Sequence, residues 1–185
     1  MAEAIAFTTF EQFAEGERAS ERRHELVAGR VYALAGGSER HDLVAGLLYE
    51  ALAPGARARG RRPFTSNRLV RTECGNGYYP DVMVVCSPAP DRLYETDPAL
   101  IVEVLSPCTE DHDRREKAVA YAESSGLQQL LLVDPDRRRI ELARPAGGRI
   151  REWLVYGAGD VVVTPYGDVD VDALYDAVDR TATTS

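Results

Sequence analysis

The spacing of apolar residues changes along the chain, and the changes predict alternating strands and helices. Uninterrupted apolar runs at 82–86, 99–105 and 130–133 are typical of strands that are buried on both faces. Apolar residues recur at helical spacing from 39 to about 53, after Ser38 as a favourable N-cap and before a stop near Pro54. Further helices are expected after Thr8 as N-cap, from about 106 to 125, and at 171–178.

Glycines and prolines divide the predicted strands. A hairpin is expected at 24–34 with Gly29 in its turn, and strands at 64–72 and 78–86 are joined at 75–77. Two more strands, 140–143 and 150–156, alternate polar and apolar residues. The run 99–105, the helix after it and the run 130–133 predict a parallel crossover. The fold class is therefore α/β, a single domain over 1–185 with a mixed central β-sheet flanked by helices.

Length and composition are typical of a globular protein and argue against membrane-spanning, secreted and disulfide-rich classes. A chain of 185 residues is long enough for one domain with a sizeable core. No apolar run approaches the ~20 residues of a membrane span, and the N-terminus lacks the pattern of a secretory signal. Three widely separated cysteines suggest neither a disulfide framework nor a zinc motif. We therefore expect a cytoplasmic protein with no membrane partner.

The distribution of basic residues bears on nucleic-acid binding. A net charge of −8 argues against a protein that coats nucleic acid through its overall field. Arginines nevertheless cluster in two parts of the chain. They are Arg57, Arg59, Arg61, Arg62, Arg68 and Arg71, and then Arg137, Arg138, Arg139, Arg144, Arg149 and Arg151. Each cluster either contacts phosphates or forms the solvated edge of an exposed strand.

An acidic residue interrupts one of the buried runs. Glu103 lies in the middle of the run 99–105, where an ionised carboxylate is costly unless it is paired or binds a metal. Asp81, which follows Pro80 and precedes the run 82–86, is a candidate partner. Two carboxylates on neighbouring strands can share a divalent cation, and Mg²⁺ prefers such oxygen ligands. The alternative for Asp81 is the capping of a turn.

Lysine is present at a single position. Lys117 is the only lysine among the 22 lysine and arginine residues, and it follows the two acids in the chain. A compact ammonium with three donors can hold or deprotonate an attacking water and face phosphoryl oxygens, which a planar guanidinium does less well. The alternative is an ion pair with Asp113, four residues earlier on the predicted helix.

Four further residues are weaker candidates for the same site. Arg114 and Tyr121 share a helical face with Lys117, and either contact phosphate or, for Tyr121, pack in the core. His41, in the first turn of a predicted helix, either touches a phosphate or metal or is a surface residue. Glu25, on a hairpin strand, either reaches the cation as a third acid or faces solvent.

Six segments of the chain form an ordered set. They are Glu25-Leu26-Val27-Ala28-Gly29, His41, Tyr79-Pro80-Asp81-Val82, Glu103-Val104-Leu105-Ser106-Pro107, 113–117 with Tyr121, and Val133-Asp134-Pro135. Together they resemble the Uma2 family of restriction-type endonucleases, within the PD-(D/E)XK nuclease superfamily. The resemblance covers about Thr8 to Tyr156, and it implies a restriction-endonuclease-like fold with its core at about 8–156 and a C-terminal extension at 157–185. It also implies Asp81 and Glu103 as metal ligands, and Glu25 as a further acid. The superfamily lysine normally follows the second acid by two places, where this chain has Leu105, so the resemblance implies that Lys117 replaces it from the next helix.

Residues and resemblance together indicate an enzyme. We expect an Mg²⁺-dependent endonuclease that hydrolyses phosphodiester bonds of DNA, with Mn²⁺ able to substitute, in which Asp81 and Glu103 hold the cation and Lys117 assists the attacking water. Two alternatives stay open. One is a catalytically silent module of the same fold that binds nucleic acid or protein, and the other is a phosphohydrolase acting on RNA or nucleotides. One active centre per chain favours a homodimer for cutting both strands.

Overall fold

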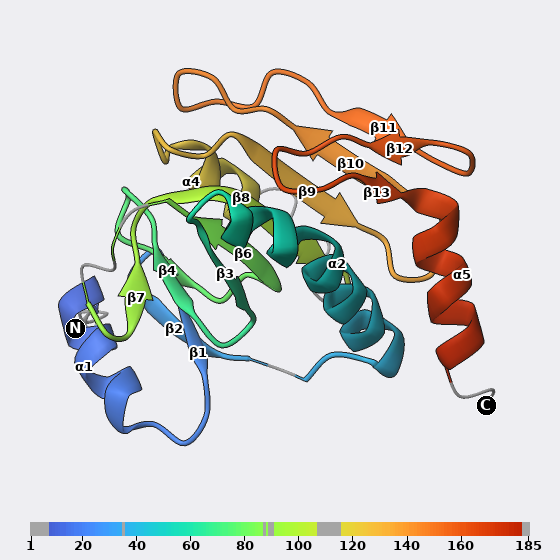
Figure 1. Ribbon diagram of the computed structural model, residues 1–185. Coiled ribbons are helices and arrows are strands. Elements are labelled where there is room, and N and C mark those ends of the chain that lie inside the picture. Colours follow the sequence, from blue (N-terminus) through green and yellow to red (C-terminus); the bar gives the residue numbers. More distant parts are fainter. Residues whose placement is uncertain (1–7, 35, 87, 89–90, 107–115, 183–185) are drawn as a thin grey trace, which may run out of the picture.

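A six-stranded mixed sheet carries helices on its faces (Figure 1). The structure is a computed structural model that describes residues 8–34, 36–86, 88, 91–106 and 116–182. The strands of this sheet, in spatial order, are β11 (Leu154–Tyr156), β10 (Ile140–Ala143), β9 (Gln129–Val133), β8 (Pro98–Val104), β6 (Val82–Val85) and β3 (Arg62–Thr65). β8 and β9 are parallel, as predicted, and the other neighbours are antiparallel. The predicted α/β class is confirmed.

A second sheet carries the N-terminal part of the chain. Its strands, in spatial order, are β2 (Arg30–Ala33), β1 (His24–Val27), β5 (Gly77–Tyr78), β4 (Leu69–Arg71) and β7 (Tyr94–Glu95). The hairpin of β1 and β2 turns through Ala28 and Gly29, whose φ angles of 48° and 76° lie in the left-handed region. α1 (Phe10–Ala19) packs on this sheet through Phe10 and Phe13.

Helices lie on both faces of the six-stranded sheet. α2 (Glu39–Ala58) packs on the face that carries Leu100 and Val102 of β8. α4 (Ala118–Ala122) packs on the opposite face, which carries Ile101. Successive side chains of a strand point to opposite faces, so every second residue from Ile101 along β8 faces α4.

The C-terminal part of the chain packs into the same core as α2. A two-stranded sheet of β12 (Val161–Val162) and β13 (Val169–Asp170) leads into α5 (Val171–Thr181), which lies beside α2 (Figure 1). The side chains of this C-terminal part that are buried in the shared core are Val162, Tyr166, Val169, Val171, Leu174, Tyr175 and Val178. The core thus continues past Tyr156.

Two of the predicted strands are divided in the structure. The segments 64–72 and 78–86 each contribute to both sheets, because β3 and β6 join the six-stranded sheet whereas β4 and β5 join the other. Pro80 lies at the break between β5 and β6, where its missing N–H donor suits a chain that leaves one ladder for another.

The helices also differ from the prediction at their ends. α1 is capped by Thr9, not Thr8, and the Thr9 side chain accepts a hydrogen bond from the backbone N–H of Gln12. α2 begins at the predicted cap, Ser38, but continues past Pro54 to Ala58, because burial of the last two turns against the sheet outweighs the hydrogen bond that proline lacks. The start of the helix predicted at about 106–125 lies outside the described residues. Among the residues described, none of the helices combines the length and apolar character that crossing a membrane requires.

Candidate active site

The two acids predicted to share a metal lie at the adjoining ends of two neighbouring strands. The antiparallel register of β6 and β8 ends with Val82 opposite Val102, so Asp81 directly before β6 and Glu103 near the end of β8 both follow this pair. Both side chains line the same cleft. The backbone N–H of Val104 donates to Oδ2 of Asp81 at 2.7 Å and fixes this carboxylate at the start of β6.

Glu103 is held by side chains from the helical segment after β8. It is 3% exposed, the Tyr121 hydroxyl donates to its Oε1 at 2.6 Å, and Nζ of Lys117 lies 3.8 Å from the same oxygen. Burial of Tyr121, followed by the negative charge of Glu103, raises the pKa of Tyr121 well above its usual value. The hydroxyl therefore stays protonated at neutral pH, and the carboxylate has the partners that its burial requires.

Lys117 is buried between two acids. Its Nζ lies 2.9 Å from Oε1 of Glu25 on β1, closer than to Glu103, and 5.7 Å from the centre of the Tyr78 ring. The same oxygen of Glu25 accepts the backbone N–H of Tyr79 at 3.4 Å. Glu25 is 5% exposed, so it does not face solvent. It binds the ammonium of Lys117, and this contact holds the lysine beside Glu103.

His41 reaches the acids from α2. Ser38 caps this helix by accepting the backbone N–H of His41 at 3.2 Å. Nε2 of His41 lies 3.3 Å from Oδ2 of Asp81, and Nδ1 lies 3.3 Å from Oδ1 of Asp42. The hydrogen bond with Asp81 raises the pKa of His41 to about 9, although burial opposes the shift. The imidazole is therefore a cation at neutral pH when Asp81 is its partner.

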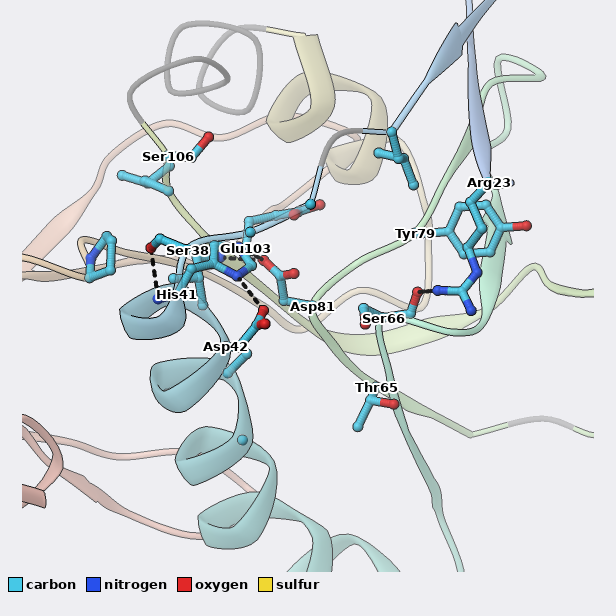
Figure 2. A pocket seen from close by; sticks show the side chains of 18 of the residues that line it. Arg23, Ser38, His41, Asp42, Thr65, Ser66, Tyr79, Asp81, Glu103 and Ser106 are labelled. Carbon is cyan, nitrogen blue, oxygen red and sulfur yellow. Dashed lines mark hydrogen bonds and ion pairs between the residues drawn. The ribbon is translucent and has the colours of Figure 1, made fainter. Parts of the chain in front are cut away.

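These side chains line one cleft of about 1010 Å³, which is at the upper end of the range for ligand sites. Figure 2 shows Asp81 between two groups of labelled residues. Ser38, His41 and Asp42 lie on one side of it, and Arg23, Ser66 and Tyr79 lie on the other. The cleft thus brings together β1, the first turn of α2, and the ends of β6 and β8.

The donor set fits a magnesium ion that keeps much of its water. Mg²⁺ is usually bound through one or two carboxylates, and Asp81 and Glu103 supply these from adjacent strands. The described residues contain no larger group of His, Cys, Asp and Glu arranged to hold a metal. The contacts of Asp81 with Val104 and His41 both use Oδ2. Asp81, Glu103 and Glu25 carry three negative charges, and the cations in contact with them are Lys117 and the protonated imidazole of His41, so the excess negative charge suits a divalent cation.

Some of the residues predicted for the site are not brought to it. Tyr121 is fully buried behind Glu103 and so does not reach a phosphate in the cleft. Arg114, and Asp113 as the alternative partner of Lys117, lie outside the described residues. Among the described residues that line the cleft there is no member of either arginine cluster.

Other residues of the cleft were missed by the sequence analysis. Arg22 and Arg23 line it, and their signal in the sequence is an adjacent pair of cations just before Glu25. Glu17 lies outside the cleft but supports it: it is 8% exposed and accepts a hydrogen bond at 3.1 Å from the hydroxyl of Tyr79, which lines the cleft. Its signal is an acidic residue on the apolar face of α1, four positions after Phe13.

Comparisons with known proteins give the family and the fold. The family model described as "Uma2: Putative restriction endonuclease" matches residues 7–166. Two Synechocystis proteins described as uncharacterized are similar in sequence. These are slr1290, 33% identical over 157 residues (81% of this chain and 80% of that protein), and sll1609, 29% identical over 152 residues (80% and 85%).

A solved structure has the same architecture. The crystal structure of "a putative nuclease belonging to DUF820" from Anabaena variabilis matches with a TM-score of 0.74 at 18% identity, over 92% of this chain and 98% of that one. At this identity the match concerns the fold, and it confirms the restriction-endonuclease-like fold that the sequence resemblance implies. Because the family model covers most of the chain, this protein belongs to the Uma2 family.

Proposed function

We propose that the protein is an endonuclease that hydrolyses phosphodiester bonds of DNA with Mg²⁺ as its cofactor, which Mn²⁺ can replace. Membership of the Uma2 family supports the nuclease class. The observation that carries the proposal is the convergence in one cleft of Asp81, Glu103 and Lys117 from three different elements.

The contacts of each side chain suggest its role. Asp81 and Glu103 would hold the cation from adjacent strands. When bound, a divalent cation neutralises charge on a phosphoryl oxygen and makes water a better nucleophile. Lys117, held by Glu25 beside Glu103, would orient the attacking water and face the phosphoryl oxygens. The Tyr121 hydroxyl would keep Glu103 oriented.

Metal binding and cleavage are measured on the same variants. Asp81→Asn and Glu103→Gln preserve side-chain shape but remove ligand charge. Each should abolish the binding of Mn²⁺ in isothermal titration and the Mg²⁺-dependent cleavage of plasmid DNA. Asp136→Asn, at an exposed carboxylate of the same cleft, is the matched control and should retain both. Undiminished cleavage by both site variants would contradict the proposal.

The choice of substrate separates the proposed function from its alternatives. Duplex DNA, single-stranded DNA, RNA and nucleotides are incubated with the wild type in Mg²⁺ and in Mn²⁺. Acid-dependent metal binding without hydrolysis of any of these indicates a catalytically silent module. Hydrolysis of RNA or nucleotides, with DNA left intact, indicates a phosphohydrolase.

We also propose that the form that cuts both strands is a homodimer, because each chain has one acid pair in its cleft. Light scattering at the protein concentration of the cleavage assay measures the mass. A monomer that converts supercoiled plasmid directly to the linear form would argue against the dimer, whereas a monomer that only nicks it would place the activity on single strands.

A further inference from the structure

The arginine clusters of the sequence are partly used inside the fold. Arg62 and Arg68 both bind the buried Glu95. Arg138 binds Asp172 and Asp176 of α5. Since the described residues that line the cleft include no cluster member, a strand of nucleic acid at the acid pair must meet other cations.

Arg22 and Arg23 are such cations. Both are exposed and line the cleft, and neither has an ion-pair partner within the part of the chain that the structure describes. Nη1 of Arg23 donates to the carbonyl oxygen of Ser66 at 3.0 Å, and its Cζ lies 5.4 Å from the centre of the Tyr79 ring. These contacts fix a planar guanidinium on the wall of the cleft while using one of its five N–H donors, a suitable arrangement for binding phosphate.

The two sides of the cleft differ in the cations that they offer to a strand of nucleic acid. On the α2 side of Asp81, Asp42 pairs with His41 at 3.3 Å and Asp136 pairs with Arg40 at 3.4 Å, so the cations on this side are already bound by carboxylates. On the opposite side, Arg23 stacks on Tyr79, two residues before Asp81 in the chain (Figure 2). Arg23 is also two residues before Glu25, so along the extended chain the two side chains point to the same face.

We propose that Arg22 and Arg23 bind the phosphates next to the cleaved one, so that the DNA strand leaves the acid pair across the stack of Arg23 on Tyr79. The inference rests on the proposed function, because it takes a nucleic-acid backbone as the substrate of this cleft. Phosphate contacts position a strand without reading its bases, so the contribution of the two arginines is independent of sequence.

Binding without cleavage tests the proposal. Fluorescence anisotropy of a labelled single-stranded oligonucleotide and of its duplex is recorded in Ca²⁺ in place of Mg²⁺, over a series of salt concentrations. Arg22→Gln and Arg23→Gln should each weaken binding by at least about threefold and reduce the salt slope by roughly 0.7–0.9, the value for one lost phosphate contact. The matched controls are Arg144→Gln and Arg149→Gln, exposed cluster members outside the cleft, which should bind as the wild type does.

The binding experiment can succeed or fail independently of the cleavage assay that tests the nuclease function. Loss of affinity in Arg22→Gln and Arg23→Gln supports the proposal even if the wild type cuts no substrate in Mg²⁺. The proposal is overturned if both variants bind as the wild type does, if the cluster controls weaken binding equally, or if the wild type binds neither oligonucleotide at low salt. Arg22→Gln serves as the test free of folding effects, because the Arg22 side chain has no hydrogen bond or ring contact to another described residue, whereas Arg23 has both.

Discussion

Lys117 contacts two acids in the cleft, Glu25 and Glu103, and substitutions can separate its catalytic role from its structural one. Nζ is paired with Glu25 at 2.9 Å and lies beside Glu103 at 3.8 Å. Lys117→Ala should lower cleavage by about 10²-fold or more, because no other described ammonium faces the acids. Lys117→Arg should restore little, because the guanidinium is planar and longer. Initial rates on plasmid DNA, with Mn²⁺ affinity from titration, measure the effect, and full activity in Lys117→Ala would remove the lysine from the mechanism.

The same substitution has a structural effect that needs its own control. Removing Lys117 leaves Glu25 buried without its ammonium, which costs about 3–5 kcal/mol when a buried pair is broken on one side. The double variant Glu25→Gln with Lys117→Met removes both charges and should regain most of that stability in urea unfolding. If it also regained cleavage, the lysine would have only a structural role.

His41 links the stability of the metal-free protein to pH. Its pKa of about 9 in the folded chain lies above the ordinary value of 6.5, so folding favours the protonated form. The resulting stabilisation is fully present below about pH 6.5 and is lost as the pH rises through about 9. In EDTA, the stability advantage of the wild type over His41→Asn should therefore shrink between about pH 6 and about pH 9.5. Urea unfolding of both proteins at the two pH values measures it, and a constant difference would contradict the assignment.

At the scale of elements, a buried carboxylate joins the two sheets. Glu95 on β7 is fully buried, and its two oxygens accept hydrogen bonds from Arg62 on β3 at 2.9 and 2.8 Å and from Nε of Arg68 at 2.9 Å. Glu95→Ala should lower the free energy of unfolding by about 3 kcal/mol, because both guanidiniums lose the carboxylate that they share. Urea unfolding measures the change.

The control for Glu95 is an ion pair between two residues of a single helix. Glu15, whose side chain is 78% exposed, pairs with Arg18 three residues later on α1. Glu15→Ala should change stability by less than about 0.5 kcal/mol, since exposed pairs of this kind contribute little. Equal effects of the two substitutions would mean that Glu95 does not join the sheets.

Local signals explain why some elements could be predicted and others could not. The apolar runs that became β6, β8 and β9 are strongly marked, and the buried position of Glu103 follows from its place within one of them. The division of 64–72 between β3 and β4 depends on which sheet each half joins, and no local pattern carries that information. The same reason explains the helix end at Ala58, where packing on the sheet overrides the signal of Pro54.

The candidate site was predictable in part for a related reason. Glu103 lies within one apolar run and Asp81 directly before another, and these two runs pair with each other, so sequence pattern and motif pointed to both acids. The contact of Lys117 with Glu25 joins residues that are distant in the chain, and the hydrogen bond of Tyr121 to Glu103 requires knowing how α4 packs. Contacts between elements are set by tertiary packing, which periodicity along one element does not reveal.

At the scale of the molecule, α2 connects the site to the C-terminal part of the chain. Its first turn carries His41 at the cleft, and Arg40 beside it binds Asp179 of α5 at 2.9 Å. Its last turns touch the backbone of the segment between β12 and β13. A Cβ added at Gly55 would lie 1.9 Å from the carbonyl oxygen of Tyr166, too close for any relaxed contact. The segment expected to be an extension thus packs directly on the helix that supports the site.

The close approach of Gly55 to the backbone of Tyr166 predicts that a single added methyl group is costly. Gly55→Ala should destabilise the protein by about 2–3 kcal/mol, because α2 and the 166–167 segment must separate to admit one methyl group. Gly16→Ala is the matched control. It replaces an exposed glycine within α1 that has nothing within 4 Å of the new Cβ, and it should raise stability by about 0.5–1 kcal/mol through helix propensity. Both are measured by urea unfolding. If the C-terminal segment were a loosely attached extension, it would move aside and Gly55→Ala would behave like Gly16→Ala. Opposite signs for the two variants would instead show that the fold carrying the site is complete only with the residues beyond Tyr156.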